Sequence, residues 1–481
     1  MIISKFDGPL NSGKSSKPAN TSRFGLRKAH RNLRFTGLLS VALLTGVLHP
    51  APAYASENEA VAVWNQRAAT TLTNGPAAAV PGVQFTPPVA VIHLAIVQGA
   101  VYDAVNAIKG GHDPYLNGLQ APTSASKGAA ASTAAHNVLI GLVNQAPLTA
   151  TLTADVKTAI KARLDEEYAS SLAEIPEGDA KADGIKVGAA AAAAMLANRA
   201  GDGRFGAPGF PFPDPPGPGQ WRPNPVNDPN AWVRNVRPFA LPNPDYFHTS
   251  GPNALTSAEY AAEFNETKSL GRATGSTRTD AQTLLAYWTA AHPVPMLYAS
   301  MRQVAASKGL TITEQARFHA MTSMATADSA INCFAEKGRW GFWRPTSAIR
   351  LADTDGNAAT EPDPDWTSLL PLPPYADEPS GANCFFSGLM NSAKAFFGND
   401  AAEFDVVSAG LGPGTGTGST RHYSHFTDVV PDVIEARILG GLHFRTADVH
   451  GAALGRSVAN YVDQHLFNCR NAGQCKQEGR E

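Results

Sequence analysis

The fold is decided by the stretch at residues 316–350, which reads ARFHAMTSMATADSAINCFAEKGRWGFWRPTSAIR. Apolar residues recur from Phe318 to Ile331 with roughly the period of an α-helix. The pattern continues to Lys337 and loosens at Gly341. The stretch therefore predicts a buried helix that delivers a lysine to its C-terminal end.

A second cation, Arg344, follows Lys337 in the sequence. Arg344 precedes Pro345, which disfavours helical geometry in the residue before it and so ends or bends the element. On a continuous helix the spacing would bring Lys337 and Arg344 to nearly the same side. Two cations beside the aromatic residues of 340–343 are costly to desolvate unless an anion meets them, which predicts half of an oxyanion pocket. Taken alone, they also fit the solvated ends of a surface helix.

Composition favours an all-α protein. The 481 residues are 43% hydrophobic and 17% charged, as in an ordinary globular chain, and alanine is abundant whereas β-branched alternation is scarce. We expect one large helical-bundle domain over residues 56–481. The helices are expected at 57–72, 87–108, 127–145, 150–170, 179–199, 257–270, 278–291, 296–308, 312–336, 387–397, 427–440 and 443–466.

Two regions depart from the helical pattern. Residues 202–256 form an insertion rich in proline and glycine, too long for a simple connection and too aromatic for a free linker, and we expect it to wrap the surface near the pocket mouth. The polar tail at about 467–481 carries Cys469 and Cys475, which in an oxidising compartment would close a small disulfide loop.

Residues 1–55 have the pattern of a secretory signal peptide. Eight basic residues and one acid precede the apolar run LLSVALLTGVL and Ala53-Tyr54-Ala55, so we expect cleavage after Ala55. The run is too short for an ordinary membrane span. Without this segment the chain keeps 31 basic and 40 acidic residues, a formal charge near −9. We therefore expect an exported protein, periplasmic or extracellular, that has no membrane span after cleavage and binds no nucleic acid.

A second motif, Pro379-Ser380-Gly381, leads into a helical run. It places a hydroxyl and free backbone N–H groups at a helix N-terminus, where an anion is favoured. An ordinary serine N-cap would give the same pattern.

A third motif contains Arg437 and His443. On an ideal helix these residues would lie about 120° apart, so they converge only if Gly440 and Gly441 break the helix. Arginine offers a planar fork to oxyanion oxygens, and histidine can act as a nucleophile or a ligand through one ring nitrogen.

The three motifs K-x6-R-P, P-S-G and R-x6-H follow one another in this order. In this the chain resembles the vanadium-dependent haloperoxidases and the related type-2 phosphatidic-acid phosphatases. Phrases such as QGAVYDAVNAI, STRTDAQTLLAYW, GFWRPTSAIR and LGGLHFRTADVHGAALG are similar to the bacterial haloperoxidase-like branch and extend the resemblance over roughly residues 85–460.

The resemblance implies a vanadate cofactor, with hydrogen peroxide and halide as substrates and a small organic molecule as acceptor. It implies an oxyanion cage of five residues: Lys337, Arg344, Ser380, Gly381 and Arg437. His443 would be the axial vanadate ligand, and Lys337 would also polarise bound peroxide. A cage of cations and donors is what a tetrahedral anion needs, unlike the carboxylate cages of metal cations.

One position departs from the family pattern. The second motif of the family usually continues with an acid-base histidine, where this chain has Ala382. Asn383 can hydrogen-bond but not titrate, and His422 and His425 are candidates to reach the pocket from another segment. Halide oxidation is the leading hypothesis. The alternatives are an acid phosphatase in which His443 attacks phosphorus, and a non-catalytic oxyanion-binding protein.

Overall fold

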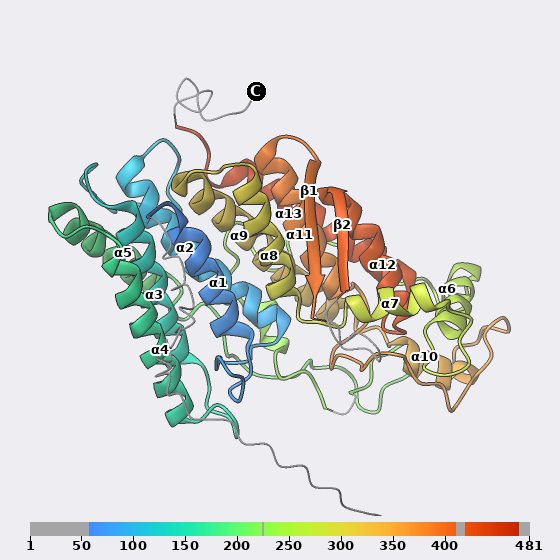
Figure 1. The fold of residues 1–481 in the computed structure, drawn as a ribbon. Coiled ribbons are helices and arrows are strands. Elements are labelled where there is room, and N and C mark those ends of the chain that lie inside the picture. The colour runs from blue at the N-terminus through green and yellow to red at the C-terminus, as the bar shows by residue number, and fades with distance from the viewer. Residues whose placement is uncertain (1–56, 224–225, 410–418, 471–481) are drawn as a thin grey trace, which may run out of the picture. The chain divides into compact units, whose positions relative to one another are not determined.

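The computed structural model describes residues 57–223, 226–409 and 419–470 (Figure 1). The predicted signal peptide lies outside them. The α-helices are α1 (Ala60–Thr73), α2 (Pro87–Lys109), α3 (Lys127–Gln145), α4 (Ala154–Ala173), α5 (Asp179–Asn198), α6 (Ala258–Leu270), α7 (Asp280–Trp288), α8 (Pro293–Ser307), α9 (Ile312–Trp340), α10 (Pro345–Arg350), α11 (Gly381–Phe397), α12 (Val429–Leu439) and α13 (Arg445–His465). Short 3-10 helices cover Glu57–Glu59, Ala231–Asn235, Ala352–Thr354 and Phe426–Asp428, and the strands are β1 (Ala401–Ser408) and β2 (Ser419–His425). The prediction of an all-α fold is confirmed.

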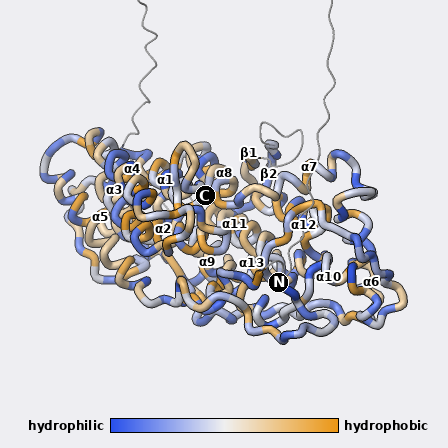
Figure 2. Tube along the Cα trace, turned by 90° about the horizontal axis from the view of Figure 1, so that it is seen from below, coloured by the Kyte–Doolittle hydropathy of each residue, from blue (hydrophilic) through white to orange (hydrophobic). Residues whose placement is uncertain are grey.

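Helix α2 is the centre of the N-terminal bundle. Pro87 and Pro88 occupy its first two positions, where a missing N–H costs nothing, and nearly every residue that follows up to Ile108 is buried. The helix packs against α1, α3, α5 and α9 and is largely orange in Figure 2. Among the described residues it alone is long and apolar enough to cross a membrane, but its whole apolar window is buried inside the protein. It is therefore built as a core helix.

Helix α9 lies between the N-terminal helices and the bundle of α11 and α13 (Figure 1). It begins with a capping box, in which Thr311 accepts the N–H of Glu314 and the Glu314 carboxylate accepts the N–H of Thr311. It ends four residues later than predicted, at Trp340, and Gly341 follows in the left-handed conformation (φ 52°). Lys337 thus lies in its last turn.

A polar stripe on α9 holds the proline- and glycine-rich insertion. The carboxylate of Asp328 accepts the backbone N–H groups of residues 239–241 at 2.7–3.0 Å. Asn332 and Glu336, one and two turns further on, bind the backbone of residues 247–249. These side chains satisfy loop amides that would otherwise be unpaired in a buried place.

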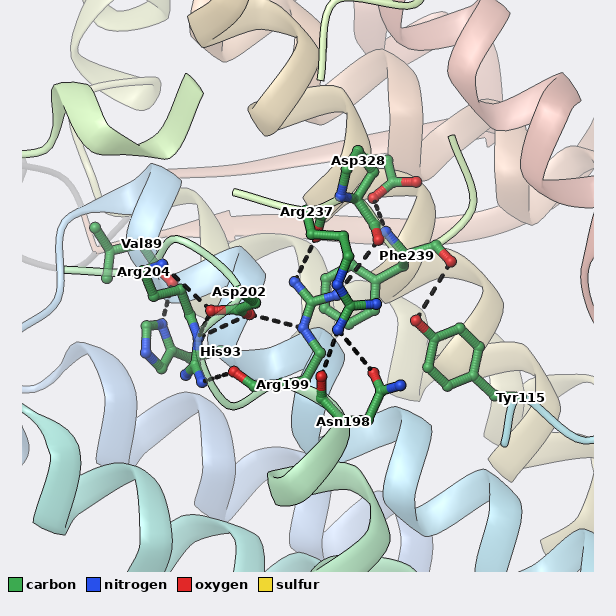
Figure 3. Close-up of polar contacts among 11 residues, drawn as sticks. Val89, His93, Tyr115, Asn198, Arg199, Asp202, Arg204, Arg237, Phe239 and Asp328 are labelled. Carbon is green, nitrogen blue, oxygen red and sulfur yellow. Dashed lines mark hydrogen bonds and ion pairs between the residues drawn. The ribbon is translucent and has the colours of Figure 1, made fainter. Parts of the chain in front are cut away.

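A second anchor of the insertion is the buried Arg199 at the end of α5 (Figure 3). Its guanidinium donates to the Asp202 carboxylate at 2.8 Å and to the Arg237 carbonyl oxygen at 2.6 Å, and it lies 4.1 Å over the ring of Phe239. Every side of this cation is therefore partnered. Arg199 and α9 thus hold the described part of the insertion between residues 202 and 249 at several points.

Glycines let α13 approach the start of α11. A Cβ atom on Gly451 would lie 2.4 Å from the Ser380 carbonyl oxygen, and one on Gly455 would lie 2.5 Å from that of Cys384. No side chain fits at such distances, so the close contact of these helices depends on glycine. The contact fixes the position of Ser380, the N-cap of α11.

One hairpin interrupts the helical pattern and was not expected from the sequence. β1 and β2 pair antiparallel, and β1 buries Phe404 and Val406 while it packs against α8. Cys469 is in a disulfide, and Cys475, its predicted partner, lies outside the described residues.

Candidate active site

Lys337 and Arg344 meet through a loop. Helix α9 ends at Trp340, and Arg344 caps α10 in extended conformation (φ −82°, ψ 157°), so the element ends before Pro345 as predicted and the two cations do not share one continuous helix. Left-handed Gly341 turns the chain back instead. Both side chains are buried and lie over the ring of Tyr375, at 5.0 Å for Lys337 and 5.1 Å for Arg344.

The insertion braces this loop. The N–H of Trp221 donates to the Gly341 carbonyl oxygen at 2.7 Å, and the N–H of Trp343 donates to that of Gly219 at 2.9 Å. The two cations are thus held between α9 and a segment more than a hundred residues earlier in the chain.

Lys337 is surrounded by backbone carbonyls. Its Nζ donates to the oxygens of Ala376, Asp377 and Pro379 at 2.7, 3.1 and 2.5 Å, which uses all three of its protons. Burial lowers its pKa to about 8. An anion that binds Lys337 must therefore replace at least one carbonyl.

Arg344 is satisfied in the same manner. It donates through Nε to the Tyr375 carbonyl oxygen at 2.8 Å and through Nη1 to that of Leu442 at 2.7 Å. Nη1 also lies 3.2 Å from Nε2 of His443. Arg344 thereby connects the first and third motifs.

His443 is a neutral imidazole. It is buried, and its pKa lies well below the usual value because of burial and of the nearby Arg344, Lys337 and Arg437. Its Nδ1 lies 2.8 Å from Oδ1 of Asp377, off the direction of a hydrogen bond. Because Nη1 of Arg344 can only donate, we assign the lone pair to Nε2, which is the atom that a ligand would use.

The glycines of the third motif bring Arg437 and His443 together. Helix α12 ends at Leu439, Gly441 has a φ of 73°, and the next helix begins only at Arg445. A Cβ atom on Gly441 would lie 2.4 Å from the Gly271 carbonyl oxygen, so this turn needs glycine. The break expected at the two glycines is present.

Arg437 differs from the other two cations because one of its buried donors has no acceptor among the described residues. It is 8% exposed, its Nε is buried, and among the described residues this atom has no hydrogen-bond partner and the side chain forms no ion pair. Burial lowers its pKa. A buried donor without an acceptor is costly, so this guanidinium is suited to receive an anion.

The N-terminus of α11 completes the cluster. The Ser380 hydroxyl caps no backbone N–H of the helix, and a Cβ atom on Gly381 would lie 3.9 Å from Cε of Lys337. Asn383 donates through Nδ2 to the Ser380 hydroxyl at 3.3 Å and to the Asp448 carboxylate at 2.7 Å, and burial raises the pKa of that carboxyl to about 8. Asn383 therefore holds the Ser380 hydroxyl and Asp448 and does not line the cavity where the missing histidine would act.

A cavity of about 430 Å³ opens beside this cluster. Arg437, Tyr375, Leu442, Ala382 and Asp228 all line it. Most of the remaining wall is apolar and rich in proline: Pro87, Pro88, Pro293, Leu369, Leu370, Pro371, Pro373, Pro374, Phe385 and Phe386. The side chain at position 382 thus faces the cavity, as an acid-base group would have to.

The expectation that His422 or His425 reaches this cavity is wrong. The imidazole of His422, on strand β2, lies 2.7 Å from the Glu403 carboxylate and 2.8 Å from that of Asp405, and His425 is 3.1 Å from Asp428. Both side chains are more than half exposed, and neither lines the cavity.

Two acids of the site were not singled out from the sequence. Asp377 stands three residues before Ser380, and its position directly beside the second motif could have marked it. Asp228 lies in the proline-rich insertion, where no local signal distinguishes it from the other acids.

A known protein family matches the part of the chain that carries the three motifs. Residues 317–472 match the family of the VCPO second helical-bundle domain. A comparison with curated proteins gives no match.

Solved structures share the fold of nearly the whole described chain. The first bacterial vanadium-dependent iodoperoxidase has a TM-score of 0.62 at 20% identity, over 86% of this chain and 98% of that one. A holo-type bacterial vanadium-dependent chloroperoxidase has a TM-score of 0.64 at 17% identity, over 85% and 97%. An apo-type chloroperoxidase has 0.61 at 17%, over 79% and 94%. The resemblance inferred from the three motifs is confirmed: residues 317–472 match the model of the VCPO second helical-bundle domain, and the chain has the fold of the bacterial vanadium haloperoxidases.

Proposed function

We propose that this protein is a vanadate-dependent haloperoxidase, which oxidises halide with hydrogen peroxide and passes the oxidised halogen to a small organic acceptor. The observation that carries the proposal is a buried, neutral His443 beside three buried cations, of which Arg437 has a buried Nε without an acceptor among the described residues. Such a site offers one ligand nitrogen and a surplus of positive charge, which is the chemistry of an oxyanion and not of a metal cation.

Each residue has a distinct part. Nε2 of His443 would hold the vanadium atom, Arg437 would donate its free Nε to an anion oxygen, and Ser380 with the Gly381 amide would donate from the start of α11. Lys337 and Arg344 would each exchange a carbonyl oxygen for an oxygen of the anion. Bound vanadate would supply the Lewis acid that activates peroxide towards halide.

The carbonyl contacts of the two cations act as counter-dipoles. Because Lys337 and Arg344 are fully buried, the protein without an anion must stabilise their charges, and the carbonyls of residues 375–379 do so. The donors therefore stay in place and need little movement when the anion enters. The apolar wall of the cavity excludes water and would hold an apolar acceptor near the oxidised halogen.

The test is halide oxidation by the mature protein. Triiodide formation and bromination of a dye are measured with hydrogen peroxide, with and without orthovanadate, for the unaltered chain and for His443→Ala. Activity that requires vanadate and is lost in the variant supports the proposal. Bound vanadate, measured by equilibrium dialysis, without halide oxidation would refute it. Release of p-nitrophenol from its phosphate ester in vanadate-free buffer would instead indicate a phosphatase.

A further inference from the structure

Asp228 is fixed at the wall of the cavity by its own backbone. Its carbonyl oxygen accepts the N–H of Gly209 at 2.8 Å, and the Asn227 side chain accepts the N–H of Asp228 at 2.9 Å. Its carboxylate Oδ1 accepts the N–H of Asn230 at 2.8 Å, and a 3-10 helix follows at once. The carboxylate therefore has a defined direction even though it belongs to a proline-rich insertion.

The second carboxylate oxygen is left over. Asp228 is 1% exposed, and among the described residues its buried Oδ2 has no hydrogen-bond partner. Native proteins rarely leave a buried carboxylate oxygen unpaired, because its desolvation is not repaid. Since this side chain lines the cavity of the oxyanion site, the free oxygen is suited to a ligand's proton.

The charges around Asp228 come from several elements. Lys337 on α9 and Arg344 at the start of α10 act on it electrostatically, and Arg437 on α12 and the phenols of Tyr287 and Tyr375 share its cavity. None of them forms an ion pair with it. Burial raises its pKa to about 6, against the opposite effect of the two cations. The group is thus neither locked as a carboxylate nor permanently protonated.

We propose that Asp228 is the proton-exchanging group of this site, in the part that a histidine at position 382 would otherwise take. The proposal rests on the proposed function. Ala382 and Asp228 line the same cavity, so side chains at these two positions face the same space although they belong to different elements. An acid on the insertion can serve there because the insertion is braced on the loop that carries the cations.

The proton balance closes on the aspartate. As hydrogen peroxide enters, one of its O–H bonds would break and the carboxylate would take that proton. The carboxyl would then return the proton to a hydroxide given up by the bound vanadate, and this hydroxide would leave as water. Asp228 ends as it began, and no other reactant is needed.

The central variant is Asp228→Asn, which keeps the shape and the acceptor for the Asn230 N–H but cannot exchange a proton. In the vanadate-loaded protein we expect kcat/KM for hydrogen peroxide to fall by about 100-fold, within the range for loss of an acid-base group. The fall of kcat/KM below about pH 6 in the unaltered protein should disappear in the variant. Adding Ala382→His to Asp228→Asn should raise kcat/KM for hydrogen peroxide at least about tenfold above that of Asp228→Asn alone.

The matched control is Asp103→Asn, the same change at a buried acid of α2 outside the cavity. This variant should keep the pH profile of the unaltered protein.

A second readout uses the protein without vanadate. Sulfate keeps its charge between about pH 5 and 8, so any pH dependence of its binding comes from the protein. Calorimetry should give equal dissociation constants for the unaltered chain and Asp228→Asn at low pH. At pH 8 the unaltered chain should bind sulfate about tenfold more weakly than Asp228→Asn does, because ionised Asp228 repels the anion.

The outcomes separate the two proposals. Suppose that the unaltered protein oxidises halide and that kcat/KM for hydrogen peroxide in Asp228→Asn stays within threefold of its value. The role of Asp228 is then overturned while the haloperoxidase proposal stands. The role of Asp228 is overturned likewise if the ratio of the sulfate dissociation constants of the two proteins does not change with pH. If the unaltered protein with bound vanadate oxidises no halide, the haloperoxidase proposal falls, and the role of Asp228 with it.

Discussion

Replacing Arg437 with methionine should stabilise the protein and weaken its hold on anions at the same time. Methionine has a similar length but no charge, and Arg437 has a buried Nε without a partner among the described residues. An unsatisfied buried donor costs about 1–3 kcal/mol, so its removal should raise the free energy of unfolding by about that amount. The loss of a charge-assisted hydrogen bond, worth about 1.5–3 kcal/mol, should weaken orthovanadate binding by roughly 10–150-fold.

Urea unfolding and equilibrium dialysis measure the two effects separately. The matched control is Arg199→Met, in which the lost guanidinium has a carboxylate and two carbonyl oxygens as partners. This variant leaves two backbone carbonyl oxygens without their donor and the buried Asp202 with Arg204 as its remaining partner, so it should lose about 1–3 kcal/mol of stability. If Arg437→Met is destabilised like the control, or binds vanadate as well as the unaltered chain does, Arg437 does not have a free buried donor that binds the anion.

Three further predictions concern the rest of the chain. Asp328→Ala removes the acceptor for three backbone N–H groups of the insertion, and we expect a loss of about 3 kcal/mol or more together with faster proteolysis within residues 202–256. Burial raises the pKa of Asp103 to about 7, so the native state binds this proton more tightly than the unfolded chain, and the stability it contributes is lost as the pH rises from about 4 to 7. Asp103→Asn should remove at most about 4 kcal/mol of that decline, seen as a smaller change in the urea midpoint between about pH 4 and 8; an equal change in both proteins would contradict this. Export should leave a mature chain that begins at Ser56, which N-terminal sequencing of the secreted protein checks and a retained Ala53 would refute.

The sequence was sufficient where local pattern determines structure. The apolar run of α2 and the capping box of α9 are written in neighbouring residues, and the structure forms both helices. The break at Gly440 and Gly441 was also foreseeable, because only a break lets Arg437 and His443 converge.

Strand β1 could have been found by searching the sequence for the two-residue alternation of a β-strand instead of the helical period. Residues 402–406 alternate buried and solvent-facing side chains, with Phe404 and Val406 inward and Glu403 and Asp405 outward. A short strand of this kind is outweighed by the helical content around it, and β1 both pairs with β2 and packs against α8, two contacts that no local pattern gives.

The wall of the cavity was beyond sequence reasoning. Asp228 reaches the site because α9 binds the insertion backbone through Asp328 and Glu336, more than eighty residues away in the chain. The carbonyls that hold Lys337 are backbone groups, which leave no trace in the identity of a residue. Both are tertiary features that no local pattern encodes.

The central claim is that His443 and the three cations form one oxyanion site, and a crystal structure of the protein soaked in orthovanadate tests it most directly. We predict a single vanadium peak bonded to Nε2 of His443, with Arg437 turned onto its oxygens and Lys337 and Arg344 each released from one carbonyl. Vanadium bound elsewhere, or an empty site in which Arg344 still contacts Nε2 at a saturating concentration, would contradict the account.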